Sequence, residues 1–170
     1  MQFNHCPKCK AKLAEATARH IDCGKCGFDF YINPVPGVDV VLVNERNEML
    51  LTVRGRAPKK GFFDLPGGFI EPRESAEQAV VREIREELGI ELETKKIIYF
   101  NSGFSTYLYK GTKYQTLGLA FFIRIQKSTV LSAADDIVGA QWFSFSKIPW
   151  SRLMSARIEL VIREAFRKMV

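Results

Sequence analysis

Hydrophobic and polar positions along the chain predict a series of strands interrupted by one amphipathic helix. Two apolar, β-branched runs, VDVVLVN (38–44) and EMLLTV (48–53), meet at the polar stretch NERNE and predict a β-hairpin. Further strands are predicted at 95–104, 116–125 and 140–145. The amphipathic sequence IELVIREAFRKMV (158–170) predicts a closing helix that packs on the sheet. Together these elements predict an α+β fold.

The clearest helical periodicity follows the loop RGRAPKKGFFDLPGGFIEPRE (54–74). Ser75 and Gln78 have the spacing of a capping box, and Gly89 is typical of the residue that ends a helix. Between these signals the apolar residues recur every four positions, at Ala76, Val80, Ile84 and Leu88. We therefore predict a helix with one apolar face.

Length and composition limit the classes of protein. A chain of 170 residues with 46% hydrophobic content predicts one main domain with a small appendage. The net charge of +6 favours attraction of polyanions, either nucleotide phosphates or nucleic acid. The apolar runs fall short of the roughly 20 residues that span a membrane. The first ten residues contain no apolar segment typical of a secretory signal, so we expect a cytoplasmic protein with no membrane partner.

The cysteines predict a metal site. They form two C-x-x-C pairs near the N-terminus, Cys6 with Cys9 and Cys23 with Cys26. Four thiolates delivered by two tight turns suit tetrahedral Zn²⁺, and a complete thiolate shell predicts a structural ion. Disulfides are the alternative, which a reducing cytoplasm disfavours. His5 and His20 flank the pairs but are not needed as ligands.

The prolines and glycine of YINPVPG (31–37) predict the end of this zinc ribbon. We therefore expect a ribbon over residues 1–35 and a main domain over residues 36–170.

Three carboxylates crowd the last turns of the predicted helix. Glu86 and Glu87 lie three and four residues after Glu83, where side chains are neighbours and like charges repel. Divalent cations such as Mg²⁺ or Mn²⁺ would remove the conflict. The alternative is a solvated acidic face. Gly67 and Gly68, just ahead of the helix, allow the backbone to come close to a metal or a phosphate.

Residues 68–90, GFIEPRESAEQAVVREIREELGI, resemble the Nudix box at every fixed position. The resemblance implies an α/β/α sandwich with a mixed sheet. It also implies Mg²⁺- or Mn²⁺-dependent hydrolysis of a diphosphate linkage in a nucleoside diphosphate derivative. Of the box residues, Arg82 would orient the carboxylates and Glu74 would support them. The implied metal ligands are the Gly67 carbonyl, Glu83, Glu86 and Glu87.

The ribbon ahead of such a domain resembles the NADH pyrophosphatases, some of which remove NAD caps from RNA. This resemblance implies an NADH-like or ADP-ribose-like substrate and a homodimer. Those enzymes carry a Ser-Gln-Pro-Trp motif shortly after the box. Residues 91–118 lack it, and the Pro-Trp pair at 149–150 comes much later.

Substrate-contacting residues are predicted outside the box. Arg54 and Phe62 are candidates to bind phosphate and base, and Glu83, Asp135 and Asp136 are candidate general bases. For the other basic and aromatic side chains, a solvated loop or core packing is the alternative; these are Arg56, Lys59, Lys60, Phe104, Tyr107 and Tyr109.

Two other classes of function stay open. One is a nucleic-acid-binding ribbon attached to a non-catalytic Nudix fold. The other is an isopentenyl diphosphate isomerase, whose additional catalytic residues have no identified counterparts in this chain. Metal-dependent turnover separates an enzyme from the first, and release of a phosphorus-containing product separates a hydrolase from the second.

Overall fold

A computed structural model describes residues 3–13, 19–126, 134 and 136–169. The chain forms two compact units, and each is described by itself. The smaller comprises Met1–Val35 with Thr106–Thr116, and the larger comprises Pro36–Ser105 with Leu117–Val170. No helix in the described ranges is long and apolar enough to cross a membrane.

The N-terminal segment is built on a two-stranded antiparallel sheet. Strands β1 (His20–Cys23) and β2 (Phe28–Tyr31) pair so that Cys23 lies opposite Phe28. The interior of this segment is small and contains Ile21 together with cysteine side chains. A core of this size needs an additional cross-link or a metal to be stable.

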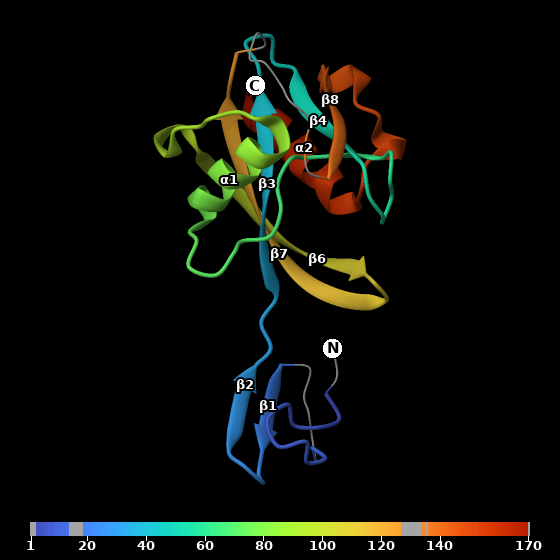
Figure 1. Cartoon of the computed structure of the whole chain (residues 1–170). Helices are drawn as coiled ribbons and strands as arrows, with labels where there is room; N and C mark the ends of the chain where they lie inside the picture. Colours follow the sequence, from blue (N-terminus) through green and yellow to red (C-terminus); the bar gives the residue numbers. More distant parts are fainter. Residues whose placement is uncertain (1–2, 14–18, 127–133, 135, 170) are drawn as a thin grey trace. The chain divides into compact units, whose positions relative to one another are not determined.

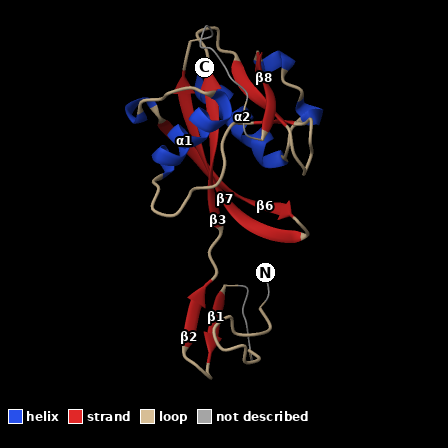
Figure 2. Ribbon diagram, in the orientation of Figure 1, coloured by secondary structure: helices blue, strands red, loops and turns tan. Residues whose placement is uncertain are grey.

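The larger unit is organised around a six-stranded sheet (Figures 1 and 2). Its strands run in the order β5-β4-β3-β7-β6, and β8 pairs with β4. Their bounds are β3 Val35–Val43, β4 Met49–Arg54, β5 Phe63–Asp64, β6 Ile98–Tyr109, β7 Thr112–Arg124 and β8 Ile137–Phe143. Three short 3₁₀ turns complete the connections: η1 Thr94–Lys96, η2 Phe145–Lys147 and η3 Trp150–Arg152.

Two helices cover opposite faces of the sheet. Helix α1 (Ala76–Leu88) packs Val80 and Ile84 against one face, where Val40 and Leu50 are buried. Helix α2 (Ala156–Met169) packs on the other face, against residues that alternate with the first set along the same strands. The structure confirms the predicted α+β class, with a helix on each side of a mixed sheet.

The ends of α1 follow the predicted signals. The Ser75 hydroxyl accepts a hydrogen bond from the Gln78 N–H, and the Gln78 side chain accepts one from the Ser75 N–H. At the other end Gly89 adopts a left-handed conformation with φ of 69°, and its N–H donates to carbonyls of the last turn. These caps fix the length of the helix, and hence which acidic side chains lie on its inner side.

A buried ion pair joins β3 to α2. Asp39 interrupts the apolar run of β3, and its Oδ2 lies 3.8 Å from Nε of Arg157. Neither atom has a hydrogen-bond partner among the residues that the structure describes. The other Arg157 nitrogens donate to Asn101 Oδ1 at 2.7 Å and to the Gly118 carbonyl at 3.2 Å. Burial raises the pKa of Asp39 to about 6, and the charge of Arg157 opposes this change.

We expect Asp39 to make stability depend on pH. A raised pKa means that the folded state binds a proton at Asp39 more readily than the unfolded chain. The carboxyl therefore stabilises the fold below its usual pKa of 3.8 and loses this contribution as the pH rises through about 6. The unfolding free energy of the wild type minus that of Asp39→Asn should fall by roughly 3 kcal/mol over this range and then stay constant.

Urea unfolding at a series of pH values measures this difference. Asp22→Asn, at an exposed aspartate, is the control and should show no such slope. A pH-independent difference for Asp39→Asn would contradict the prediction, because it would show that folding leaves the pKa of Asp39 unchanged.

Candidate active site and metal centre

A glycine loop connects β5 to α1 and follows the edge of β3. The Val38 N–H donates to the Gly68 carbonyl at 2.8 Å, and the Val40 N–H donates to the Pro66 carbonyl at 2.9 Å. Gly67 has a φ of +141°, and a Cβ at this position would lie 2.1 Å from the Val38 carbonyl oxygen. Only glycine can occupy this position without moving the strand.

Two glutamates of α1 are buried against this loop. Glu83 and Glu87 are 8% and 5% exposed, and Glu87 Oε2 accepts a hydrogen bond from the Gly67 N–H at 3.1 Å. A Cβ on Gly68 would lie 2.3 Å from Glu83 Oε1. The backbone of the loop and the two carboxylates are therefore in direct contact because the glycines have no side chains.

Burial gives Glu87 an unusual titration. Burial, the largest cause, acts together with the charges of Glu83, Asp136 and Asp64 to raise the pKa of Glu87 to about 9, while the Gly67 N–H opposes the change. A carboxylate in such a position needs a proton or a cation to offset its charge. Clustered hard oxygen atoms suit Mg²⁺ or Mn²⁺, so the donor set fits either ion.

Arg82 holds the acidic cluster from outside. Its Nε and Nη2 donate to the two carboxylate oxygens of Glu74 at 2.9 and 3.0 Å. Its Nη1 donates to Glu83 at 2.8 Å and to Glu86 at 3.2 Å, and Nη2 also reaches the Phe69 carbonyl at 3.0 Å. These hydrogen bonds, led by those to Glu74, raise the pKa of Arg82, and the same contact lowers the pKa of Glu74.

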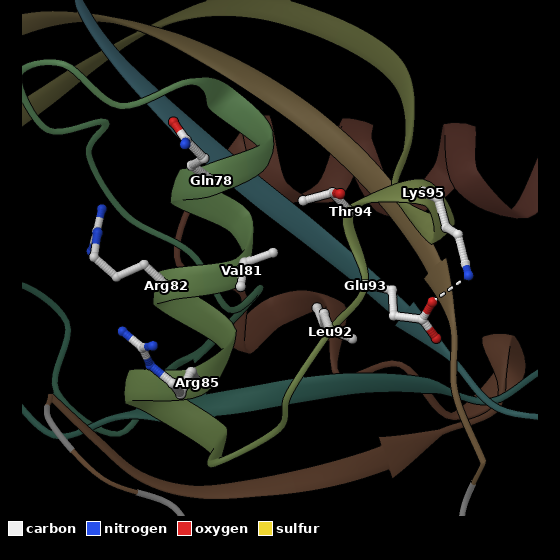
Figure 3. Close-up of a pocket in the computed structure, with 8 residues that line it drawn as sticks. All are labelled: Gln78, Val81, Arg82, Arg85, Leu92, Glu93, Thr94 and Lys95. Atoms are coloured by element: carbon white, nitrogen blue, oxygen red, sulfur yellow. Dashed lines mark ion pairs between the residues drawn. The ribbon is translucent and has the colours of Figure 1, made fainter.

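The predicted acidic ligands differ in exposure. The Glu86 side chain is 44% exposed and lies at the rim, whereas Glu83 and Glu87 lie inside. A separate groove of about 540 Å³ opens between α1 and the segment that contains η1, and it is lined by Val81, Arg85, Leu92 and Lys95 among others (Figure 3). None of the three acidic residues lines this groove.

Two aspartates extend the acidic cluster beyond α1. The Gly55 N–H donates to the Asp136 carbonyl at 2.7 Å, which fixes Asp136 beside the end of β4. Asp64 ends β5, and burial raises its pKa to about 6, against the charge of Arg54. Asp136 was a predicted candidate base. Sequence analysis missed Asp64, whose only local signal is its position three residues before Gly67. Asp135 lies outside the described residues.

Of the predicted substrate-binding residues, Arg54 ends β4 and Phe62 lies on the loop between β4 and β5. Arg54 Nη1 pairs with Asp64 at 2.9 Å, and its Nε donates to the Pro58 carbonyl at 3.0 Å. The Lys59 ammonium lies 5.2 Å from the centre of the Phe62 ring. Arg54 is thus already engaged within the protein, so a substrate phosphate would have to share its guanidinium with Asp64.

The four cysteines come together as the sequence predicts. Their sulfur atoms all lie within 4.8 Å of one another. The Sγ atoms of Cys6 and Cys26 are 3.7 Å apart, as are those of Cys9 and Cys23. A tetrahedral zinc with bonds of about 2.3 Å needs sulfur atoms about 3.8 Å apart, whereas a disulfide needs about 2.05 Å. The cluster therefore fits Zn²⁺ and not two disulfides.

The neighbouring histidine has other partners. His20 Nε2 contacts the Asp29 carboxylate, and its ring lies 4.5 Å from that of Tyr31. The cysteine cluster that could hold zinc includes no histidine among the described residues.

Comparisons with known proteins agree on one family. The family model described as NUDIX domain matches residues 33–165. The NAD-capped RNA hydrolase NudC of Pseudomonas aeruginosa is 32% identical over 147 residues, which cover 85% of this chain and 49% of that protein. The ADP-ribose pyrophosphatase of Methanocaldococcus jannaschii is 32% identical over 72% of this chain and 69% of its own length.

A solved structure gives the same result. The MutT NUDIX hydrolase from Burkholderia pseudomallei superposes with a TM-score of 0.66 at 25% identity, covering 78% of this chain and 98% of that one. The present chain spans about half the length of the NudC relative.

Replacing one cysteine should release the metal. We expect Cys23→Ser to reduce bound zinc from about one ion per chain to well below that, because three thiolates no longer close the shell. Elemental analysis of the purified protein measures the zinc. His20→Asn, beside the cluster, should keep its zinc. An unchanged zinc content in Cys23→Ser would contradict the assignment.

The contact between the loop and Glu83 should control binding of divalent cations. In Gly68→Ala the new methyl group displaces the Glu83 carboxylate, so we expect Mn²⁺ to bind roughly 10-fold more weakly. Electron paramagnetic resonance of free Mn²⁺ measures this affinity. Gly139→Ala is the matched control, because a Cβ there would meet no atom within 4 Å. Equal Mn²⁺ affinities in the two variants would rule out this role for Gly68.

Proposed function

The chain belongs to the NUDIX family, and from this premise we propose that it hydrolyses a diphosphate linkage in a nucleoside diphosphate derivative with Mg²⁺ or Mn²⁺. The observation that carries the proposal is the burial of Glu87 against the backbone of Gly67 and of Glu83 against Gly68. Burying carboxylates without a counter-charge is energetically unfavourable. A divalent cation bound by their oxygens would supply that counter-charge.

The proposed metal ligands are the Gly67 carbonyl and the carboxylates of Glu83, Glu86 and Glu87. When bound, the cation would offset the negative charge of the diphosphate and lower the pKa of the attacking water. Arg82 acts as a positioning residue, since its hydrogen bonds to Glu83 and Glu86 fix the orientation of both carboxylates.

Removal of the water proton requires a base close to the cluster. Among the residues that the structure describes, the candidate bases are Glu83 and Asp136. Both lie close enough to Glu87 to raise the pKa of Glu87. Asp136 is held by its backbone contact with Gly55, which leaves its carboxylate available as a proton acceptor. We propose Asp136 for this role, with Glu83 as the alternative.

The names of the relatives support a substrate that contains ADP. The two curated relatives are named for NAD-capped RNA and for ADP-ribose, which share an ADP group with NADH. We propose an NADH-like or ADP-ribose-like substrate, bound in part by Phe62 and by Arg54 while it stays paired with Asp64. The absence of the Ser-Gln-Pro-Trp motif from residues 91–118 leaves the choice within this class to experiment.

The remaining expectations extend this proposal. We propose that residues 1–35 form a structural zinc ribbon and residues 36–170 the hydrolase domain. The fit of the thiolates to zinc is consistent with a reducing, cytoplasmic location. The homodimer expected from the subfamily resemblance stays a proposal, which light scattering would test.

A substrate panel tests the function. NADH, ADP-ribose, FAD, dinucleoside polyphosphates and nucleoside triphosphates are each incubated with Mg²⁺ in ¹⁸O-labelled water. We expect two phosphorylated products from NADH or ADP-ribose, with ¹⁸O in one of them. Absence of turnover on the whole panel, together with salt-sensitive RNA binding, would favour the non-catalytic alternative.

One substitution tests the role of the buried carboxylate. Glu87→Gln should lower kcat by at least about 100-fold and weaken Mn²⁺ binding, because it removes a charged ligand while keeping the shape of the side chain. Circular dichroism should show an intact fold. Glu91→Gln makes the same chemical change at an exposed residue just beyond the helix and should retain full activity. Turnover at the wild-type level in Glu87→Gln would refute the assignment.

A further inference from the structure

A cationic and aromatic groove lies on the face of the sheet that α2 covers, whereas α1 and its carboxylates lie on the opposite face. We call it the α2 groove. Its volume is about 520 Å³, and it is lined by Phe145, Arg163, Phe166 and Arg167. Phe145 begins η2, and α2, which Figure 1 labels, provides the other three residues.

Flat side chains pack in sequence at the groove, at tilted or edge-to-face angles. The Phe145 ring packs on Phe166 with centroids 4.4 Å apart, and the edge of Phe145 meets Trp150 at 5.3 Å. The Arg163 guanidinium lies over the Trp150 ring at 4.1 Å. Phe145 stays 41% exposed and the Arg163 side chain 43% exposed. The groove therefore offers an aromatic surface and a guanidinium plane to a flat ligand.

The lining of the groove is mostly apolar, and its two cationic side chains are Arg163 and Arg167. Arg163 pairs with Glu159 at 2.8 Å, which fixes the guanidinium over Trp150. Arg167 lies one helical turn further on, and no described acidic side chain pairs with it. Lys147 shares η2 with Phe145 and likewise has no acidic partner among the described residues. Of the residues that line the groove, Arg167 thus remains available to an anionic ligand, and Lys147 lies outside the lining.

We propose that the α2 groove binds single-stranded nucleic acid. A base would stack on Phe145 or on the Arg163 guanidinium, and Arg167 would contact an adjacent phosphate. Stacking on aromatic and arginine planes, combined with a basic groove, is the chemistry by which proteins bind unpaired strands. The proposal rests on the proposed function, because an RNA whose capped end enters the active site continues beyond it as an unpaired, anionic chain.

Fluorescence anisotropy with a labelled, uncapped 12-nucleotide RNA tests the site. This probe has no diphosphate linkage, so the catalytic centre cannot account for its binding. We expect Arg167→Gln to weaken binding about 5-fold and to reduce the slope of log Kd against log salt by about 1. Phe145→Ala should weaken binding by a similar factor with little change in the slope, because stacking releases few counterions. The same RNA as a duplex should bind more weakly than the single strand.

Lys95→Gln is the charge-matched control, since Lys95 lines the groove beside α1. Because Phe145 packs on its neighbours, Arg167→Gln at an exposed position tests the site even if Phe145→Ala unfolds. Three outcomes would each overturn the proposal: unchanged RNA binding in Arg167→Gln, equal binding of duplex and single strand, or equal competition by polyglutamate, which would indicate an acidic protein partner.

Hydrolysis of NADH and ADP-ribose by the same variants separates the two proposals. If hydrolysis is normal but substitutions in the α2 groove leave RNA binding unchanged, the groove proposal is wrong and the proposed function stands. If the groove substitutions weaken RNA binding but the protein hydrolyses no compound of the panel, the proposed function is wrong and the groove proposal stands.

Discussion

The proposed active site depends on the contact between the glycine loop and the buried carboxylates of α1. Glu87 accepts a hydrogen bond from Gly67, and the Glu83 carboxylate occupies the space that a Cβ on Gly68 would fill. Two elements support this contact. Strand β3 holds the loop through backbone hydrogen bonds, and the apolar face of α1, packed on the sheet, positions the acidic residues of the helix next to the loop. The unfavourable energy of burying these two carboxylates therefore arises at a place where a bound divalent cation would offset their charge.

Much of the scaffold could be predicted because its signals are local. Helix α1 repeats its apolar residues every four positions and carries a capping residue at each end, so both its bounds and its inner face follow from sequence. The cysteine pairs are similar, because their spacing already implies four converging thiolates. The two-residue strand β5 escaped prediction since nothing in FFDLPGG distinguishes it from the surrounding loop.

The electrostatic partners within the fold could not be predicted in the same way. Asp39 interrupts an apolar strand, and its counter-charge, Arg157, is 118 positions later in α2. Asp64 meets Arg54 only because β4 and β5 pair. The burial of Glu87 is also non-local, because helical periodicity predicts that acidic side chains face solvent. Ion-pair partners and the burial of a charged side chain are determined when distant elements pack together, so a pattern along the chain does not predict them.

The glycine loop also decides which parts of the protein can be altered to change its substrate. At Gly67 a side chain would collide with the main chain of β3, which cannot move aside without disturbing the whole sheet. The loop between β4 and β5 and the turns before α2 carry no comparable restriction at most positions. Mutations intended to change the specificity would therefore be placed in the loop between β4 and β5 and in the turns before α2. The glycine loop next to α1 would be kept unchanged.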